Sequence, residues 1–106
     1  SNNSPVDYLL IDLIDKHLQI TNYSIQNSDD YFLLSWSFEG STDNNSWDIL
    51  DTQTISNPPP YGWNTFAIST TNSYRFFRIV MVGNDSQGTN YFTISEFELY
   101  GVISAI

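Results

Sequence analysis

Between residues 34 and 40, apolar and polar residues alternate strictly along the chain. The apolar positions are Leu34, Trp36 and Phe38, and the residues between them are polar. A period of two places alternate side chains on opposite faces of a β-strand, so these three are expected to face one core. Gly40 ends the alternation, and a polar turn leads to Trp47. We therefore expect a β-hairpin with a tryptophan on each side of its turn, both rings anchored in the core.

Similar patterns along the chain predict about seven strands and no helix. The expected strands are residues 8–13, 19–26, 33–40, 47–54, 63–68, 75–82 and 92–100. Asp15–His17 is the expected first turn. Asn57–Pro60 is expected to be an extended loop, because three successive prolines cannot donate to a strand ladder. Short strands separated by Pro, Gly and Asn are typical of an all-β protein built as an antiparallel β-sandwich or jelly roll.

The last strand carries two apolar pairs of opposite parity. Phe92 and Ile94 share one parity, whereas Phe97 and Leu99 share the other. Strict alternation would turn one of the two pairs away from the core. We therefore expect a β-bulge near Ser95–Glu96.

Length and charge limit the classes of protein. A chain of 106 residues buries one core, so we expect a single domain over residues 1–106, part of a larger protein or assembly. Twelve acidic residues against three Lys and Arg give a net charge of −9. Such a surface repels phosphate, which excludes nucleic acid as a partner and disfavours a membrane surface. The absence of cysteine favours an intracellular setting over an extracellular one.

No group of residues indicates an enzyme. His17 is the only histidine and there is no cysteine, so a zinc site or a cysteine nucleophile lacks its components. The acidic pairs are Asp29 with Asp30, Asp48 with Asp51, and Glu96 with Glu98. Glycoside hydrolysis needs two acids facing across a cleft, whereas neighbouring acids in loops usually face solvent. We therefore predict a non-enzymatic protein.

One charged pair is expected to be structural. Glu39 and Arg78 each lie within a strongly apolar strand, where a charge normally requires an opposite partner. We expect Arg78 to form an ion pair with Glu39 or with Asp12, inside or beside a sheet.

Three motifs occur in the order found in a known family. Residues 36–47 read W-x-x-E-G-S-x-D-x-x-x-W, Tyr23–Ile25 reads Y-S-I, and Phe77–Ile79 followed by Ile94–Gly101 reads F-R-I and I-S-E-F-E-L-Y-G. Over residues 7–101 the chain resembles discoidin domains, the type C domains of coagulation factors five and eight. The resemblance implies the galactose-binding-like β-sandwich. Full members carry several tens of residues before the strand that matches residues 8–13, so the chain resembles an N-terminally shortened member.

The resemblance also suggests functions. The closing motif looks most like versions within large intracellular proteins such as ubiquitin ligases and BTB proteins, which implies a module for protein–protein interaction. A galactose-type, lectin-like carbohydrate-binding module outside the cell is the first alternative, and a structural subunit docked in an assembly is the second. Related domains often hold one structural calcium ion with a glutamate near the last strand, which Glu96 or Glu98 would match. Most of the other calcium ligands come from N-terminal loops that lack a counterpart here.

Loop residues are the remaining candidates for binding a protein or glycan partner. Tyr61 and Trp63 flank a glycine beside the proline run, where an exposed ring suits a sugar face or an apolar anchor. The alternative is that these rings only cover the end of the sandwich. Polar loops contribute further candidates, namely Asp43, Asn44, Asn84 and Asp85. Their amide and carboxylate groups complement sugar hydroxyls and polar protein surfaces equally well.

Overall fold

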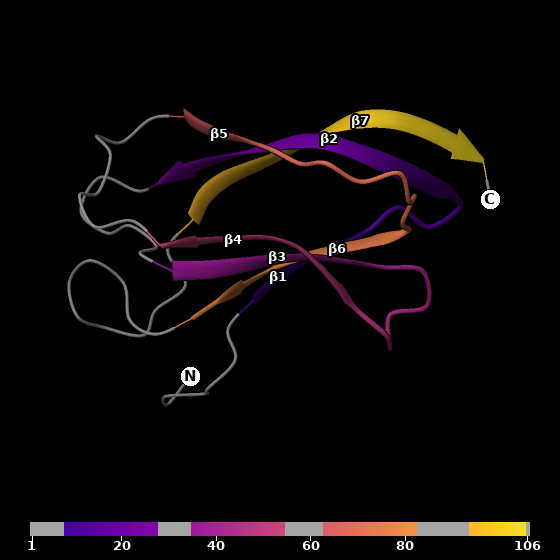
Figure 1. Ribbon diagram of the computed structural model, residues 1–106, viewed down its shortest axis with the longest axis horizontal. Helices are drawn as coiled ribbons and strands as arrows, with labels where there is room; N and C mark the ends of the chain where they lie inside the picture. The colour runs from indigo at the N-terminus through magenta and orange to yellow at the C-terminus, as the bar shows by residue number, and fades with distance from the viewer. Residues whose placement is uncertain (1–7, 28–34, 55–62, 83–93, 106) are drawn as a thin grey trace.

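The computed structural model describes residues 8–27, 35–54, 63–82 and 94–105, and within these ranges all the regular structure is β-strand. The strands are β1 (Tyr8–Asp12), β2 (Lys16–Asn27), β3 (Ser35–Ser41), β4 (Asp48–Thr54), β5 (Trp63–Ala67), β6 (Phe76–Met81) and β7 (Ile94–Ala105). One sheet has the order β1-β6-β3-β4 and the other β5-β2-β7, with every pairing antiparallel. Figure 1 shows the two sheets as two layers. The predicted antiparallel β-sandwich of seven strands is confirmed.

The first turn lies earlier in the chain than the sequence predicts. Ile14 has a φ of 65°, and the Asp15 amide donates a hydrogen bond to the Leu13 carbonyl at 2.8 Å. The chain therefore reverses around Ile14, and β2 already begins at Lys16. The prediction that Asp15–His17 form the turn is wrong, because this tight reversal needs fewer residues.

The bulge predicted in the last strand is confirmed. Gln26 pairs with Glu96 and the next residue, Asn27, pairs with Ile94, so Ser95 is the extra residue. This extra residue changes the parity of β7. Phe97 and Leu99 then pack against the core.

The last strand also runs past its predicted end at Tyr100, as far as Ala105. Gly101 permits this, because a Cβ atom at that position would lie only 2.2 Å from the carbonyl oxygen of Gln19 on β2. A second register shift, at Thr21 of β2, lies beside this close approach. Only a glycine lets the two backbones come together here.

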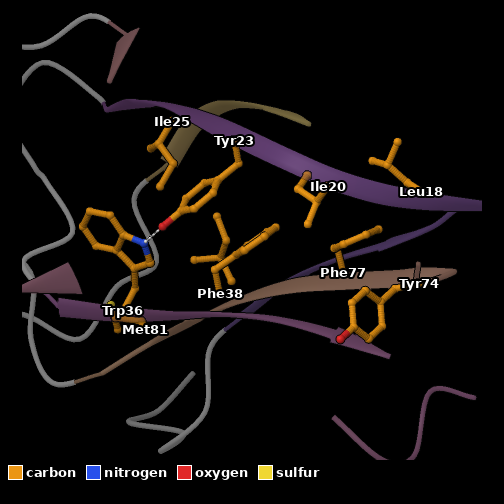
Figure 2. Packing of buried hydrophobic residues seen from close by; sticks show 10 residues of the cluster. Leu18, Ile20, Tyr23, Ile25, Trp36, Phe38, Tyr74, Phe77 and Met81 are labelled. Atoms are coloured by element: carbon orange, nitrogen blue, oxygen red, sulfur yellow. Dashed lines mark hydrogen bonds between the residues drawn. The ribbon is translucent and has the colours of Figure 1, made fainter. Parts of the chain in front are cut away.

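The core between the sheets is rich in aromatic side chains, as Figure 2 shows. Its buried members are Leu18, Ile20, Tyr23, Ile25, Trp36, Phe38, Tyr74, Phe77, Ile79 and Met81. The Tyr23 ring of one sheet stacks on the Phe38 ring of the other, with ring centres 4.2 Å apart. Leu9, Ile11 and Leu13 are half-buried, whereas Leu10 between them is exposed, as the predicted alternation requires.

A polar network crosses this apolar core. The indole Nε1 of Trp36 donates to the hydroxyl of Tyr23 at 2.9 Å (Figure 2). That hydroxyl in turn donates to Asp51 Oδ2 at 2.6 Å. Because Tyr23 is on β2 while Trp36 and Asp51 are on β3 and β4, the network joins the two sheets. Burial and the Asp51 carboxylate raise the pKa of Tyr23 far above its usual value, so the hydroxyl stays protonated and keeps donating.

Candidate functional site

The outer face of the four-stranded sheet carries an ion pair. Arg78 of β6 lies directly opposite Glu39 of β3, and its Nη2 lies 2.7 Å from Glu39 Oε1. Glu39 is buried, and its second oxygen accepts a hydrogen bond from Ser37 Oγ at 2.7 Å. The guanidinium lies 4.0 Å from the centre of the Trp47 ring. The sequence predicted an ion pair of Arg78 with Glu39 or with Asp12, and in the structure the partner is Glu39.

Asp12 is engaged elsewhere. Its carboxylate accepts from Arg75 Nε at 2.7 Å and from Nη2 at 3.1 Å, and it also accepts the amide of Ile14 at 2.8 Å. The Arg75 hydrogen bond and the Ile14 amide lower the pKa of Asp12. Pairing of Asp12 with Arg78 was the wrong alternative, because the register places Asp12 opposite Phe76, two residues along β6.

Trp47 lies outside the core, contrary to the expectation for the hairpin. On β6, Phe77 and Ile79 point into the sandwich, so Arg78 between them points outward, and the Trp47 ring packs on this outer side. Trp47 precedes the first residue of β4 and so escapes the strand alternation that directs Trp36 inward.

The turn before Trp47 is held by its own side chains. Asp43 Oδ1 accepts the amides of Asn45 and Ser46, both at 2.8 Å, and the hydroxyl of Ser41 at 3.0 Å. These hydrogen bonds lower the pKa of Asp43. Asn44 is exposed and has a φ of 61°, a conformation that asparagine tolerates well. Asp43 thus shapes the turn through Oδ1, and its role as a ligand-binding residue stays a prediction.

Beside this turn the surface is hollowed, with a volume of about 540 Å³. The lining residues are Trp47, Asp48, Ile49, Leu50, Ser69, Thr70, Asn72 and Tyr74. They come from Trp47 and the first residues of β4, which it precedes, and from the segment that connects β5 to β6. None of these lining residues is Lys or Arg. The hollow therefore combines an aromatic ring and aliphatic side chains with a carboxylate, an amide and hydroxyl groups.

Gly40 explains how Tyr74 reaches this hollow. A Cβ atom on Gly40 would lie 2.8 Å from Cγ of the Tyr74 ring, so the ring rests directly on the strand backbone. From there the Tyr74 hydroxyl donates to Asp48 Oδ2 at 2.7 Å. Asn72 Nδ2 lies within 3.4 Å of the same hydroxyl. Burial and Asp48 raise the pKa of Tyr74, which keeps it a donor at neutral pH.

The sequence-predicted loop residues do not gather at one place. Trp63 begins β5 opposite Gln26, near the end of β2, and its side chain is 44% exposed. The turn that contains Asp43 and Asn44 lies at the other end of the sandwich, as Figure 1 shows for the β3–β4 connection. The remaining candidates, Tyr61, Asn84 and Asp85, lie outside the described residues.

The two candidate calcium ligands are placed as follows. Glu98 is exposed and accepts a hydrogen bond from the Tyr100 hydroxyl, while the side chain of Glu96 lies outside the described part. Within the residues that the structure describes, no three His, Cys, Asp or Glu side chains come together as a metal site would require. The same described ranges contain no helix long and apolar enough to cross a membrane.

Sequence reasoning missed most of the hollow. Thr70, Asn72 and Tyr74 were not candidates, and Asp48 was considered only as half of an acidic pair. They meet Trp47 because β4 and the β5–β6 connection lie side by side in the fold, and local pattern does not reveal such an encounter. The sequence did contain one indication of this site. The polar segment Ser69–Tyr74 ends in a tyrosine and resembles a binding loop as much as a turn.

No protein-family model matches the sequence. The chain is 35% identical over 91 residues to the E3 ubiquitin-protein ligase hecd-1 of Caenorhabditis elegans, covering 78% of the chain and 3% of that ligase. It is 32% identical over 101 residues to a BTB/POZ domain-containing protein of Arabidopsis thaliana, covering 87% of the chain and 12% of that protein. The chain thus corresponds to a small part of each relative.

Solved structures share the fold over most of this chain and about two thirds of their own length. The C-terminal domain of a chitobiase from Bacteroides fragilis has a TM-score of 0.76 at 13% identity, covering 96% of this chain and 67% of that one. A chitosan-binding module of a chitosanase/glucanase from Paenibacillus sp. IK-5 has a TM-score of 0.72 at 15% identity, covering 92% and 70%. A family 32 carbohydrate-binding module from a Clostridium perfringens glycoside hydrolase has a TM-score of 0.66 at 19% identity, covering 90% and 66%. The chain therefore has the galactose-binding-like, discoidin-type β-sandwich fold, which the chitobiase domain and the carbohydrate-binding modules share.

Proposed function

We propose that this domain is a non-catalytic carbohydrate-binding module and that the hollow beside Trp47 is its binding site. The observation that carries the proposal is the composition of the hollow, whose lining includes Trp47 together with Asp48, Asn72 and Tyr74. Within it the Tyr74 hydroxyl donates to Asp48. Small-ligand sites typically combine apolar and aromatic walls with a few convergent polar groups. The fold shared with carbohydrate-binding modules supports the same function.

The chemistry of the hollow suits a sugar ring. The apolar C–H face of a sugar packs on an aromatic ring, as the half-buried Trp47 ring allows. Sugar hydroxyls can donate to the Asp48 carboxylate, which as a charged acceptor makes stronger hydrogen bonds than a neutral one. Asn72 and Thr70 add groups that both donate and accept.

The acidic residues of β4 support a role without catalysis. Asp48 accepts the hydroxyl of Tyr74, and Asp51 accepts the hydroxyl of Tyr23 from the core. A glycosidase needs two carboxyl groups on either side of one sugar bond. Here Asp51 is engaged in the core network, so among the described residues that line the hollow Asp48 is the one acid.

The test is a glycan array followed by calorimetry, with the wild type beside Trp47→Ala. The matched control is Trp63→Ala, which removes a partly exposed tryptophan at the other end of the sandwich. We expect saccharide binding that is lost in Trp47→Ala and kept in Trp63→Ala, while circular dichroism shows that both variants fold. Loss of binding only in Trp63→Ala would move the site to β5, and an array without any bound saccharide would overturn the proposal.

Recognition of a protein partner is the second candidate, because the two curated relatives are a ubiquitin ligase and a BTB/POZ protein. In that case the same hollow would take a polar and aromatic protein segment inside a larger intracellular protein. A silent glycan array, together with a purified partner that binds the wild type but not Trp47→Ala, would favour this function over the first.

A further inference from the structure

The last part of β7 is an exposed and uncharged sheet edge. β7 is the outer strand of the order β5-β2-β7, so in the described sheet it pairs on one side with β2 alone. Val102 is 65% exposed and Ile103 is 58% exposed. From Leu99 to Ala105 the sequence contains no charged residue, although the whole chain carries −9.

Such an unprotected strand edge is unusual for a monomeric protein. Edge strands are normally protected by lysine, proline, inward charges or bulges, because their free N–H and C=O groups otherwise pair with another strand. Leu99–Ala105 contains none of the protecting residue types, and the bulge of β7 lies earlier, at Ser95. The edge is therefore suited to accept a further strand.

We propose that β7 pairs in antiparallel fashion with β7 of a second copy, centred on Val102, and joins two three-stranded sheets into one of six strands. With this centre, the cross-strand pairs are Leu99 with Ala105, Tyr100 with Ser104, Gly101 with Ile103, and Val102 with itself. Each pair away from the centre sets a large residue against a small one. Ile103 of each copy fills the space left by Gly101 of the other, so the segment is complementary to itself.

Charge also favours a second copy in this register. Like charges directly opposite each other destabilise a strand pair, and here the paired segments carry none. Glu98 of each copy lies beyond Ala105 of the other. The remaining acidic surfaces still repel, so salt strengthens the dimer by screening the −9 charge of each chain. The contact is small, so the dimer is weak and depends on protein concentration.

Sedimentation velocity from micromolar to near-millimolar concentration, at low and at moderate salt, tests the proposal. We expect the wild type to change from monomer to dimer as concentration and salt rise. Val102→Lys places two lysines opposite each other at the centre and should remain monomeric. Leu10→Lys is the matched control, because Leu10 is an exposed apolar residue on the β1 edge of the other sheet and does not line the hollow. This variant should dimerise like the wild type.

A second experiment tests the register in which Val102 pairs with itself. Val102→Glu alone should also be monomeric. A mixture of Val102→Lys and Val102→Glu should form a heterodimer, since the two opposite charges then meet at the centre. A wild type that stays monomeric throughout, a Val102→Lys variant that dimerises normally, or a mixture that does not associate would each overturn the proposal. The hollow is lined by β4 and the β5–β6 connection, so dimerisation and saccharide binding are measured independently.

Discussion

The two tryptophans of one hairpin have different surroundings. Trp36 lies within β3, is 3% exposed and donates its indole N–H to Tyr23 in the core. Trp47, just beyond the turn, lies half-buried over Arg78 on the outer face and lines the hollow. The comparison shows that the face of the sheet on which a tryptophan lies determines whether its ring packs in the core or remains at the surface. The inward ring holds the sheets together, whereas the outward ring remains accessible to a ligand.

The largest expected effect is a difference in the free energy of unfolding between variants at the two tryptophans. Trp36→Ala should lower the free energy of unfolding by about 3–5 kcal/mol, because it leaves a cavity and removes a donor to Tyr23. Trp47→Ala should cost about 1 kcal/mol, because its cation–π contact is partly exposed. Urea unfolding followed by circular dichroism measures both. Similar losses in the two variants would contradict the division into a structural and an accessible tryptophan.

The core network should show the next largest effect. Tyr23→Phe keeps the ring stack with Phe38 but leaves the buried Trp36 N–H and the Asp51 carboxylate without the hydroxyl. A buried polar group that loses its partner costs about 1–3 kcal/mol. Tyr100→Phe is a suitable control, because the Tyr100 hydroxyl binds the exposed Glu98 instead. A Tyr23→Phe variant as stable as the control would show that the network contributes little.

Alkaline pH should weaken the same network. The pKa of Tyr23 is raised in the folded state above the 10.0 that is usual for tyrosine, so the unfolded chain loses this proton at lower pH than the folded chain. The stability that Tyr23 contributes is therefore complete below pH 10 and decreases as the pH rises beyond it. Unfolding measured at increasing pH should show a shallower decline in Tyr23→Phe than in the wild type. Equal slopes would contradict the raised pKa.

The outer face should show a smaller effect. Glu39→Ala removes the carboxylate that pairs at 2.7 Å with the half-buried Arg78, and should cost about 1–2 kcal/mol after allowance for partial exposure. Asp12→Asn disrupts the more exposed pair with Arg75 and should cost less. Thermal unfolding at low and high salt distinguishes the pairs, because salt screens the exposed one more strongly. A greater loss in Asp12→Asn would reverse this ranking.

The sequence predicts the features that depend on local alternation. Parity alone assigns Trp36 to the core and predicts a bulge near Ser95–Glu96, which the register places at Ser95. It fails at Ile14, because a β-branched residue rarely adopts a positive φ and the local preference points elsewhere.

The hollow could not be predicted from the sequence, because it forms only in the folded chain. Its two halves, Trp47–Leu50 and Ser69–Tyr74, are separated in the sequence and meet only when β4 lies beside the β5–β6 connection. In the sequence, Gly40 marks the end of a strand pattern. The need for a glycine at this position comes from the Tyr74 ring that lies against it, and this contact is visible only in three dimensions.

A ligand that binds beside Trp47 would change the environment of its indole, and a ¹H–¹⁵N spectrum reports the indole N–H signals of all three tryptophans. The domain is titrated with galactose and with chitosan fragments, and each indole signal is assigned by mutation. We predict that the Trp47 signal shifts in a saturable manner with one of these sugars, while those of Trp36 and Trp63 stay in place. A shift of Trp63 instead, or no saturable shift with either sugar, would contradict a carbohydrate site in the hollow.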